Sequence, residues 1–216
     1  MEALKTMGAY LHSLKSFEIR AEIAYDDVSD GGNLIQRNES VAGAIRKPNR
    51  LWVKTSGAGR EREIFYDGST VTVFGARLGF YAQFNAPPTI GETVTAAIEK
   101  YDLEIPLSDL FFWGTDESDI DAINSAIKVG PAQIGNRRCD QYAFSQDDVT
   151  WQIWITQGET KSPCKLVIVD TSQDARPQYS ATIEVIADKS FPEETFVFSA
   201  PKTAYKIKIL ASDAVD

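Results

Sequence analysis

The sequence predicts a mainly β protein with helices (α+β), in which about ten or eleven antiparallel strands form an incomplete barrel under a helical lid. Three observations support this prediction. Long stretches alternate between apolar and polar residues, turn-forming residues separate them, and one helical insertion interrupts them at about residues 89–127. Because a sheet of this size tends to curl, the helices are expected to cover its concave face.

The composition is typical of one globular domain spanning residues 1–216. Hydrophobic residues make up 43% of the chain and charged residues 25%, which is enough apolar material for one large core. The formal net charge of -9 argues against sequence-independent binding to the phosphate backbone of nucleic acids. No apolar run reaches the roughly 20 residues that a membrane helix needs. We therefore expect no nucleic-acid partner and no integral membrane segment.

Helices are predicted where apolar residues recur every three or four positions. Such a stripe, made by Leu4, Met7, Leu11 and Leu14, predicts a helix over residues 3–15. Thr89 and Glu92 have the spacing of a capping box and predict a helix over about 90–101. Acidic residues after Thr115 favour another helix start, with that helix running to about Ala126.

Strands are predicted where apolar residues recur at every second position. Residues 17–25 are apolar at each odd position, as expected for a strand with one face in water. Further strands are expected over residues 34–46, 51–55, 79–84, 139–145, 150–157, 165–170, 179–188 and 196–198.

Residues 64–73 predict a hairpin, because Asp67-Gly68 suits a two-residue type I′ turn. This turn would pair Tyr66 with Ser69 and Ile64 with Val71. Four apolar side chains would then share one face, and the threonines between them would face water; the four are Ile64, Tyr66, Val71 and Val73.

The two cysteines, Cys139 and Cys164, permit one disulfide. A third predicted strand lies between their strands, however, and two strand spacings of about 9 to 10 Å exceed the roughly 7 Å Cα limit for a bridge. The spacing therefore favours two unpaired thiols and leaves a disulfide as the alternative.

The catalytic and metal-binding patterns considered are missing from the sequence. There is no Gly-x-Ser-x-Gly elbow, no phosphate-binding loop and no dinucleotide glycine pattern, and the single histidine, His12, lies off the helical stripe. The acidic run at 116–121 lacks the ligand spacing of a calcium loop and is interpreted as a helix start. We expect no cofactor, no metal and no enzymatic activity. An enzyme with paired carboxylates is a third hypothesis.

The order of five segments resembles a known family. These segments are Ile45–Val53 (IRKPNRLWV), Tyr66–Phe74 (YDGSTVTVF), Pro106–Leu110 (PLSDL), Cys139–Phe144 (CDQYAF) and Trp151–Trp154 (WQIW). The N-terminal helix, the alternating strand, the first two segments, the helical insertion and the later strands follow one another in an order similar to that of the family of the periplasmic lipoprotein carrier LolA and its outer-membrane receptor LolB. The last three segments resemble a related group of uncharacterised, predicted periplasmic bacterial proteins, which the sequence looks most like. The resemblance covers nearly the whole chain.

The resemblance implies an apolar cavity that receives acyl chains under the helical lid. Lys47 stands where the carrier has a basic residue that helps hold the lid, whereas Leu51 and Val53 replace larger aromatics. In the apolar run 110–113, successive helical side chains diverge by about 100°, and Leu110 and Trp113 are predicted to face the cavity. The candidate ligand-binding residues are Ile45, Lys47, Leu51, Val53, Ile64, Tyr66, Val71, Val73, Leu110 and Trp113.

The leading hypothesis is therefore a non-enzymatic periplasmic or cell-envelope protein that binds an acyl chain, a lipid or a lipoprotein in this cavity. A signal peptide is expected to have been removed from the sequence. The alternative is an envelope-sensing or protein-interaction module on the same fold, which would bind an envelope protein at the sheet edge or the lid.

Overall fold

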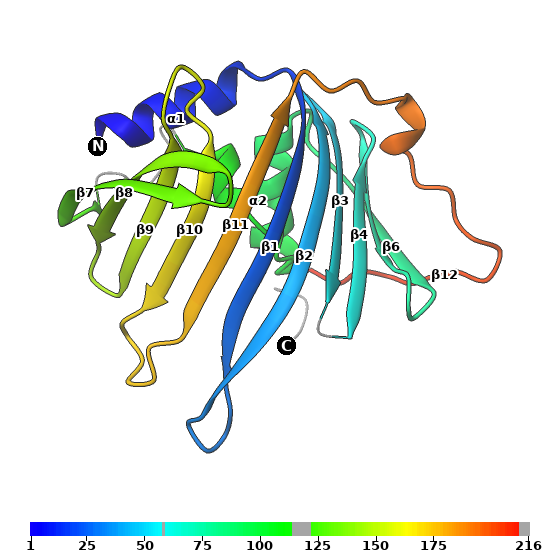
Figure 1. Ribbon diagram of the computed structural model, residues 1–216. Coiled ribbons are helices and arrows are strands. Elements are labelled where there is room, and N and C mark those ends of the chain that lie inside the picture. Colours follow the sequence, from blue (N-terminus) through cyan, green and yellow to red (C-terminus); the bar gives the residue numbers. More distant parts are fainter. Residues whose placement is uncertain (58, 114–121, 212–216) are drawn as a thin grey trace. The chain divides into compact units, whose positions relative to one another are not determined.

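In the computed structural model, residues 1–57, 59–113 and 122–211 are described. Within these ranges, twelve strands form one open sheet in the order β12-β6-β5-β4-β3-β2-β1-β11-β10-β9-β8-β7 (Figure 1). The strands are β1 (Ser16–Val28), β2 (Leu34–Arg46), β3 (Arg50–Gly57), β4 (Arg60–Tyr66), β5 (Thr70–Gly75), β6 (Phe80–Asn85), β7 (Ser125–Ile134), β8 (Arg137–Ser145), β9 (Val149–Thr156), β10 (Pro163–Asp170), β11 (Gln178–Ala187) and β12 (Tyr205–Lys206). The helical elements are α1 (Glu2–Ser13), α2 (Ile90–Tyr101) and the short 3-10 turns η1 (Ser108–Phe111) and η3 (Glu193–Thr195). The predicted fold class, mainly β with helices on an open and largely antiparallel sheet, is confirmed.

The chain divides into two compact units. The first unit contains residues 1–13, 20–40 and 112–185, and the second contains residues 14–19, 41–111 and 186–216. Strands β1, β2 and β11 contribute residues to both units. One domain spanning residues 1–216 stays a prediction.

The buried residues of the first unit come mainly from α1, from β1 and from β8 to β11. The predicted stripe is confirmed, since Leu4, Met7 and Leu11 are all buried. Pairing places Ile153 of β9 opposite Leu166 of β10, so that these buried side chains share a face. This apolar face fixes the register of the strands.

Strand β7 was not predicted. The described part of the expected helix near Ala126 is instead extended, and β7 starts at Ser125; the earlier part, 115–121, lies outside the described residues. The helical prediction was wrong here because β7 is an edge strand with little burial on either face, so its sequence lacks alternation. Pro131, which has no N–H to donate, is tolerated at such an edge.

Cys139 and Cys164 form a disulfide, which corrects the preference for free thiols. Their Cα atoms are 6.9 Å apart, although β9 runs between β8 and β10. Cys139 lies opposite Thr156, the last residue of β9, and Cys164 is at a register shift in β10. The bridge is therefore possible because the strand between the cysteines ends there and β10 is irregular.

The helix of the second unit confirms the predicted start and end of α2. The backbone N–H of Glu92 donates to Thr89 Oγ1 at 3.3 Å, and Asp102 adopts a left-handed conformation at the C-terminus. The side chains of Ile90, Val94 and Ala97 are buried. They form the apolar side of the helix within this unit.

The β4–β5 hairpin has a wider turn than predicted. Tyr66 pairs with Val71 and Ile64 with Val73, so four residues rather than two lie between the paired positions that are nearest to the turn. The carboxylate of Asp67 accepts hydrogen bonds from the backbone N–H groups of Ser69 and Thr70, and these contacts stabilise the wider loop. The shift is two residues, so the four apolar side chains still share one face.

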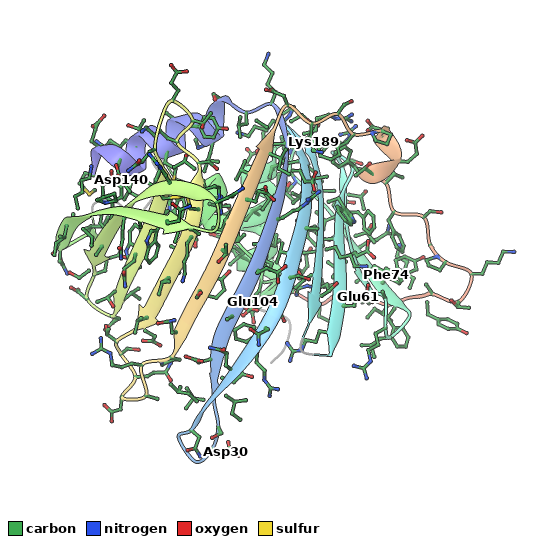
Figure 2. All side chains as sticks on the ribbon, viewed as in Figure 1. Asp30, Glu61, Phe74, Glu104, Asp140 and Lys189 are labelled. Carbon is green, nitrogen blue, oxygen red and sulfur yellow. A yellow bond between two sulfur atoms is a disulfide. The ribbon has the colours of Figure 1, made fainter. Side chains whose placement is uncertain are left out.

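The other face of β4 to β6 is covered, whereas the sequence indicated that it faces water. The ring of Phe198 lies 5.0–5.4 Å from the rings of Phe65, Phe74 and Tyr81, and Figure 2 shows Phe74 near the C-terminal segment. Thr72 on the same face is only 3% exposed. The expected strand 196–198 is not formed; Phe198 contributes its ring to this packing, and β12 pairs with β6 instead.

Candidate ligand pocket

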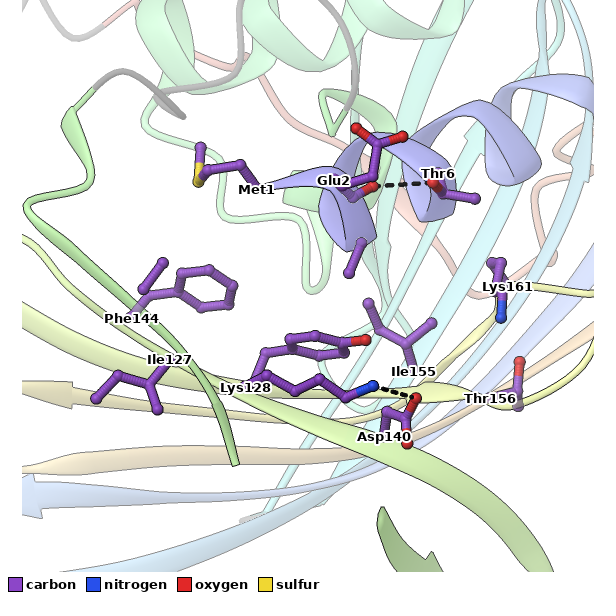
Figure 3. Close-up of a pocket in the computed structure, with 13 residues that line it drawn as sticks. Met1, Glu2, Thr6, Ile127, Lys128, Asp140, Phe144, Ile155, Thr156 and Lys161 are labelled. Carbon is purple, nitrogen blue, oxygen red and sulfur yellow. Dashed lines mark hydrogen bonds and ion pairs between the residues drawn. The ribbon is translucent and has the colours of Figure 1, made fainter. Parts of the chain in front are cut away.

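A pocket of about 370 Å³ lies between the start of α1 and strands β7 to β9 of the first unit (Figure 3). Antiparallel pairing builds its wall, because Ala126 of β7 lies opposite Phe144 of β8, and Ile155 of β9 lies opposite Asp140. Thr6 of α1 and Met1, which precedes the helix, also line it. The volume falls within the roughly 300–1,000 Å³ of small-molecule sites in proteins.

One end of the pocket is apolar. Phe144, which is 4% exposed, forms its buried part, and Ala126 lies opposite it. Ile155 is 3% exposed and pairs with Asp140 at the other end. Phe144 is held in place by Trp151, whose ring stacks on it with centroids 4.2 Å apart. Tyr142 lies between this apolar part and the charged groups, on the same face of β8 as Phe144. This end can bury apolar ligand surface without a polar partner.

The other end carries charge. Lys128 Nζ lies 3.2 Å from Asp140 Oδ2 and 5.8 Å from the centroid of the Tyr142 ring (Figure 3). The side-chain amide of Gln157 donates to Asp140 Oδ1 at 2.8 Å. The amide and then Lys128 hold the pKa of Asp140 below its ordinary value, and the hydrogen bond to Asp140 raises the pKa of Lys128. Both groups are therefore charged at neutral pH.

The contact between Lys128 and Asp140 is expected to be lost only in acid. Because the folded-state pKa of Asp140 is lowered, its stabilising effect is present above the ordinary Asp value of about 3.9 and disappears as the pH falls through the lower folded-state pKa. Carbon-13 NMR titration of the Asp140 carboxyl group measures this, with Asp140→Asn to assign the signal. A midpoint at or above the ordinary value would contradict the prediction.

The ten residues predicted to bind ligand do not line this pocket. Seven of them are at most 6% exposed, namely Ile45, Leu51, Val53, Ile64, Tyr66, Val71 and Leu110. Strand pairing in the second unit places Leu51, Val53, Ile64, Tyr66, Val71 and Val73 on one face. The structure therefore brings these six together, and their role in ligand binding stays a prediction.

The other predicted residues are half-buried. Lys47 Nζ lies 6.0 Å from the centroid of the Phe17 ring, and burial lowers the pKa of Lys47. Trp113 is half-buried and Leu110 is buried, whereas the packing of Phe111 lies outside the described side chains. Which of them faces a ligand stays a prediction.

The pocket residues could not be chosen from the sequence. The alternation of Asp140, Tyr142 and Phe144 on one strand was a usable signal, because it places all three on one face. Their partners Ala126 and Lys128, however, belong to the edge strand that has no clear pattern. Among the side chains that the structure describes, no group of three or more His, Cys, Asp or Glu could hold a metal ion.

The fold, an open mainly β sheet, is also found in solved structures of other proteins. It is similar to the lipoprotein LppX of Mycobacterium tuberculosis, with a TM-score of 0.51, 10% identity, and coverage of 85% of this chain and 92% of that one. The chain belongs to the family described as "Predicted periplasmic protein (DUF2092)", whose model matches residues 1–210. The predicted resemblance to a family of predicted periplasmic proteins is confirmed, and the family description agrees with the predicted location.

Two further solved structures are similar at lower scores. LprF from Mycobacterium bovis has a TM-score of 0.48 at 10% identity, covering 94% of this chain and 96% of that one. A LolA superfamily protein from Nitrosomonas europaea has a TM-score of 0.42 at 8% identity, covering 91% and 96%. No curated protein matches the sequence. None of the helices in the described ranges is long and apolar enough to cross a membrane.

Proposed function

We propose that this protein binds the acyl chain of a lipid or lipoprotein, without chemical conversion, in the pocket of the first unit. The observation that carries the proposal is the division of the pocket into an apolar end at Phe144 and Ala126 and a charged end at Lys128 and Asp140. Such a division matches an amphiphile, whose chain and polar group need different surroundings.

The energetics support binding by burial alone. Each buried methylene contributes about 0.8 kcal/mol, so about ten carbons contribute on the order of 8 kcal/mol before the entropic cost of association. Lys128 and Asp140 contact and neutralise each other, and Lys161 adds a positive charge to the pocket lining. This pairing favours a role in binding the polar group over a role in acid–base chemistry.

The ten residues predicted from the sequence form a second proposed site in the other unit. Their support is the shared apolar face of β3 to β5, with Lys47 half-buried nearby in sequence. The two proposed sites lie on different peptides, so one experiment separates them.

A photoactivatable fatty acid tests the proposal directly. After illumination and proteolysis, mass spectrometry is expected to find adducts on peptides that contain Ala126, Tyr142 or Ile155. Ala126 is exposed at the pocket and tolerates a large side chain, so Ala126→Trp fills the space and is expected to lower labelling at least tenfold. Ser125→Trp is the matched control, because the neighbouring residue points to the other face.

The labelled peptides distinguish the two proposed sites. If residues 45–73 or 107–113 are labelled, and Ala126→Trp does not change that labelling, the acyl chain binds at the ten predicted residues instead. Labelling that is absent, or that competing unlabelled fatty acid does not reduce, would refute acyl-chain binding in either place.

A further inference from the structure

The edge of the second unit at β6 and β12 carries an exposed apolar surface, which we call the edge patch. Four large apolar side chains are between 43% and 73% exposed there, and each lies in or beside the backbone segments that pair β6 with β12. They are Leu78, Phe80, Tyr205 and Ile207. Large exposed apolar side chains that gather in one place mark interaction surfaces.

The edge patch is held in place by backbone and ring contacts. The N–H of Tyr205 donates to Gly79 O, and the N–H of Ile207 donates to Tyr81 O, both at 2.8 Å. The rings of Phe80 and Tyr205 lie 6.3 Å apart. The segment that leads to β12 is anchored by Phe198 on the sheet. The surface is therefore built into the fold of this unit.

The same edge is basic. Lys202, Lys206 and Lys208 are exposed, and residues 75–85 and 199–211 contain no Asp or Glu, in a chain whose net charge is -9. Arg77 adds a fourth positive charge and donates to the carbonyl of Gly59. Asp213 and Asp216 follow in the sequence, outside the described residues. A local positive charge on an acidic protein selects a negatively charged partner.

We propose that the edge patch docks on the surface of an anionic phospholipid bilayer. Lysines next to Tyr, Phe and Leu match the bilayer interface, where apolar rings enter the headgroup layer and Lys side chains contact lipid phosphates. Protein interfaces, by contrast, are depleted in Lys. A second copy of this chain would bring like charges together. The docking surface is independent of the proposed acyl-chain site, because it lies on other residues in the other unit.

Vesicle co-sedimentation tests this inference. The protein is expected to sediment with vesicles of three parts phosphatidylcholine to one part phosphatidylglycerol, and not with phosphatidylcholine alone. Since each lysine near an anionic surface contributes about fivefold, the triple substitution Lys202→Glu, Lys206→Glu and Lys208→Glu is expected to weaken binding at least 100-fold. Leu78→Ser with Ile207→Ser is expected to weaken it at least about tenfold, because apolar burial is lost.

The matched control changes the same number of charges elsewhere. Lys5, Lys15 and Arg138 are exposed, and their substitution by Glu is expected to retain most of the binding. Ala126→Trp should also retain it, which separates docking from acyl-chain binding. Equal binding to both vesicle types, equal loss in the control triple, or a dimer that forms through the edge patch would overturn the inference.

Discussion

Replacing Phe196 with alanine is expected to lower the free energy of unfolding by about 3–5 kcal/mol, the range for truncating a fully buried Phe. Phe196 is 0% exposed, and its ring has the Arg46 guanidinium at 4.9 Å and the Phe191 ring at 6.0 Å. Truncation would leave a cavity and remove both contacts. The loss is large because a packed neighbourhood does not collapse fully around a missing ring.

Urea unfolding followed by tryptophan fluorescence measures this change. Val197→Ala is the matched control, since Val197 is 46% exposed and surface truncation usually stays within about 0.5 kcal/mol. Phe196→Leu should have a smaller effect than alanine because it fills most of the space. An alanine variant with wild-type stability would show that the C-terminal segment does not contribute to this core.

Removing the disulfide is expected to cost about 3 kcal/mol, because the bridge closes a loop of 25 residues and restricts the unfolded chain. Both sulfur-bearing residues are fully buried, so the double variant Cys139→Ala and Cys164→Ala avoids placing a hydroxyl in the core. The Arg137 side chain donates hydrogen bonds to the backbone carbonyls of Ile183 and Cys164, and these bonds still connect β8 with β10 and β11 in the double variant. We therefore expect a folded but weakened first unit.

The measurement is urea unfolding of the wild type, oxidised and reduced, beside the double variant. The reduced wild type and the double variant should unfold at similar urea concentrations, both below the oxidised protein. If all three unfold together, the bridge adds nothing to stability.

Elements with a strong local pattern could be predicted from the sequence. The stripe of Leu4, Met7 and Leu11 predicted α1, and the capping pair Thr89 and Glu92 predicted α2 within a residue. Most strands were also predicted, because one buried face leaves an apolar residue at every second position. The prediction that the four hairpin side chains share a face was correct although the predicted turn was wrong, since the predicted and observed registers differ by an even number of residues.

The pocket could not be predicted, because its residues meet only through strand pairing. Tyr142 and Phe144 lie 14 or more residues after Ala126 and Lys128, and β7 has no period that reveals it. The turn after Tyr66 was equally out of reach, because side-chain contacts of Asp67 select a wider turn than the one that Asp-Gly permits.

The fold class, the two helices, most strands and the family could be predicted from the sequence, because each depends on periodicity, capping or motif order along the chain. The disulfide, the pocket and the packing of Phe196 and Phe198 became visible in the folded structure. These features depend on contacts between residues that are distant in sequence, and no local sequence pattern indicates where one strand ends beside another. The disulfide is an example, because Cys139 and Cys164 come together where β9 ends between their strands.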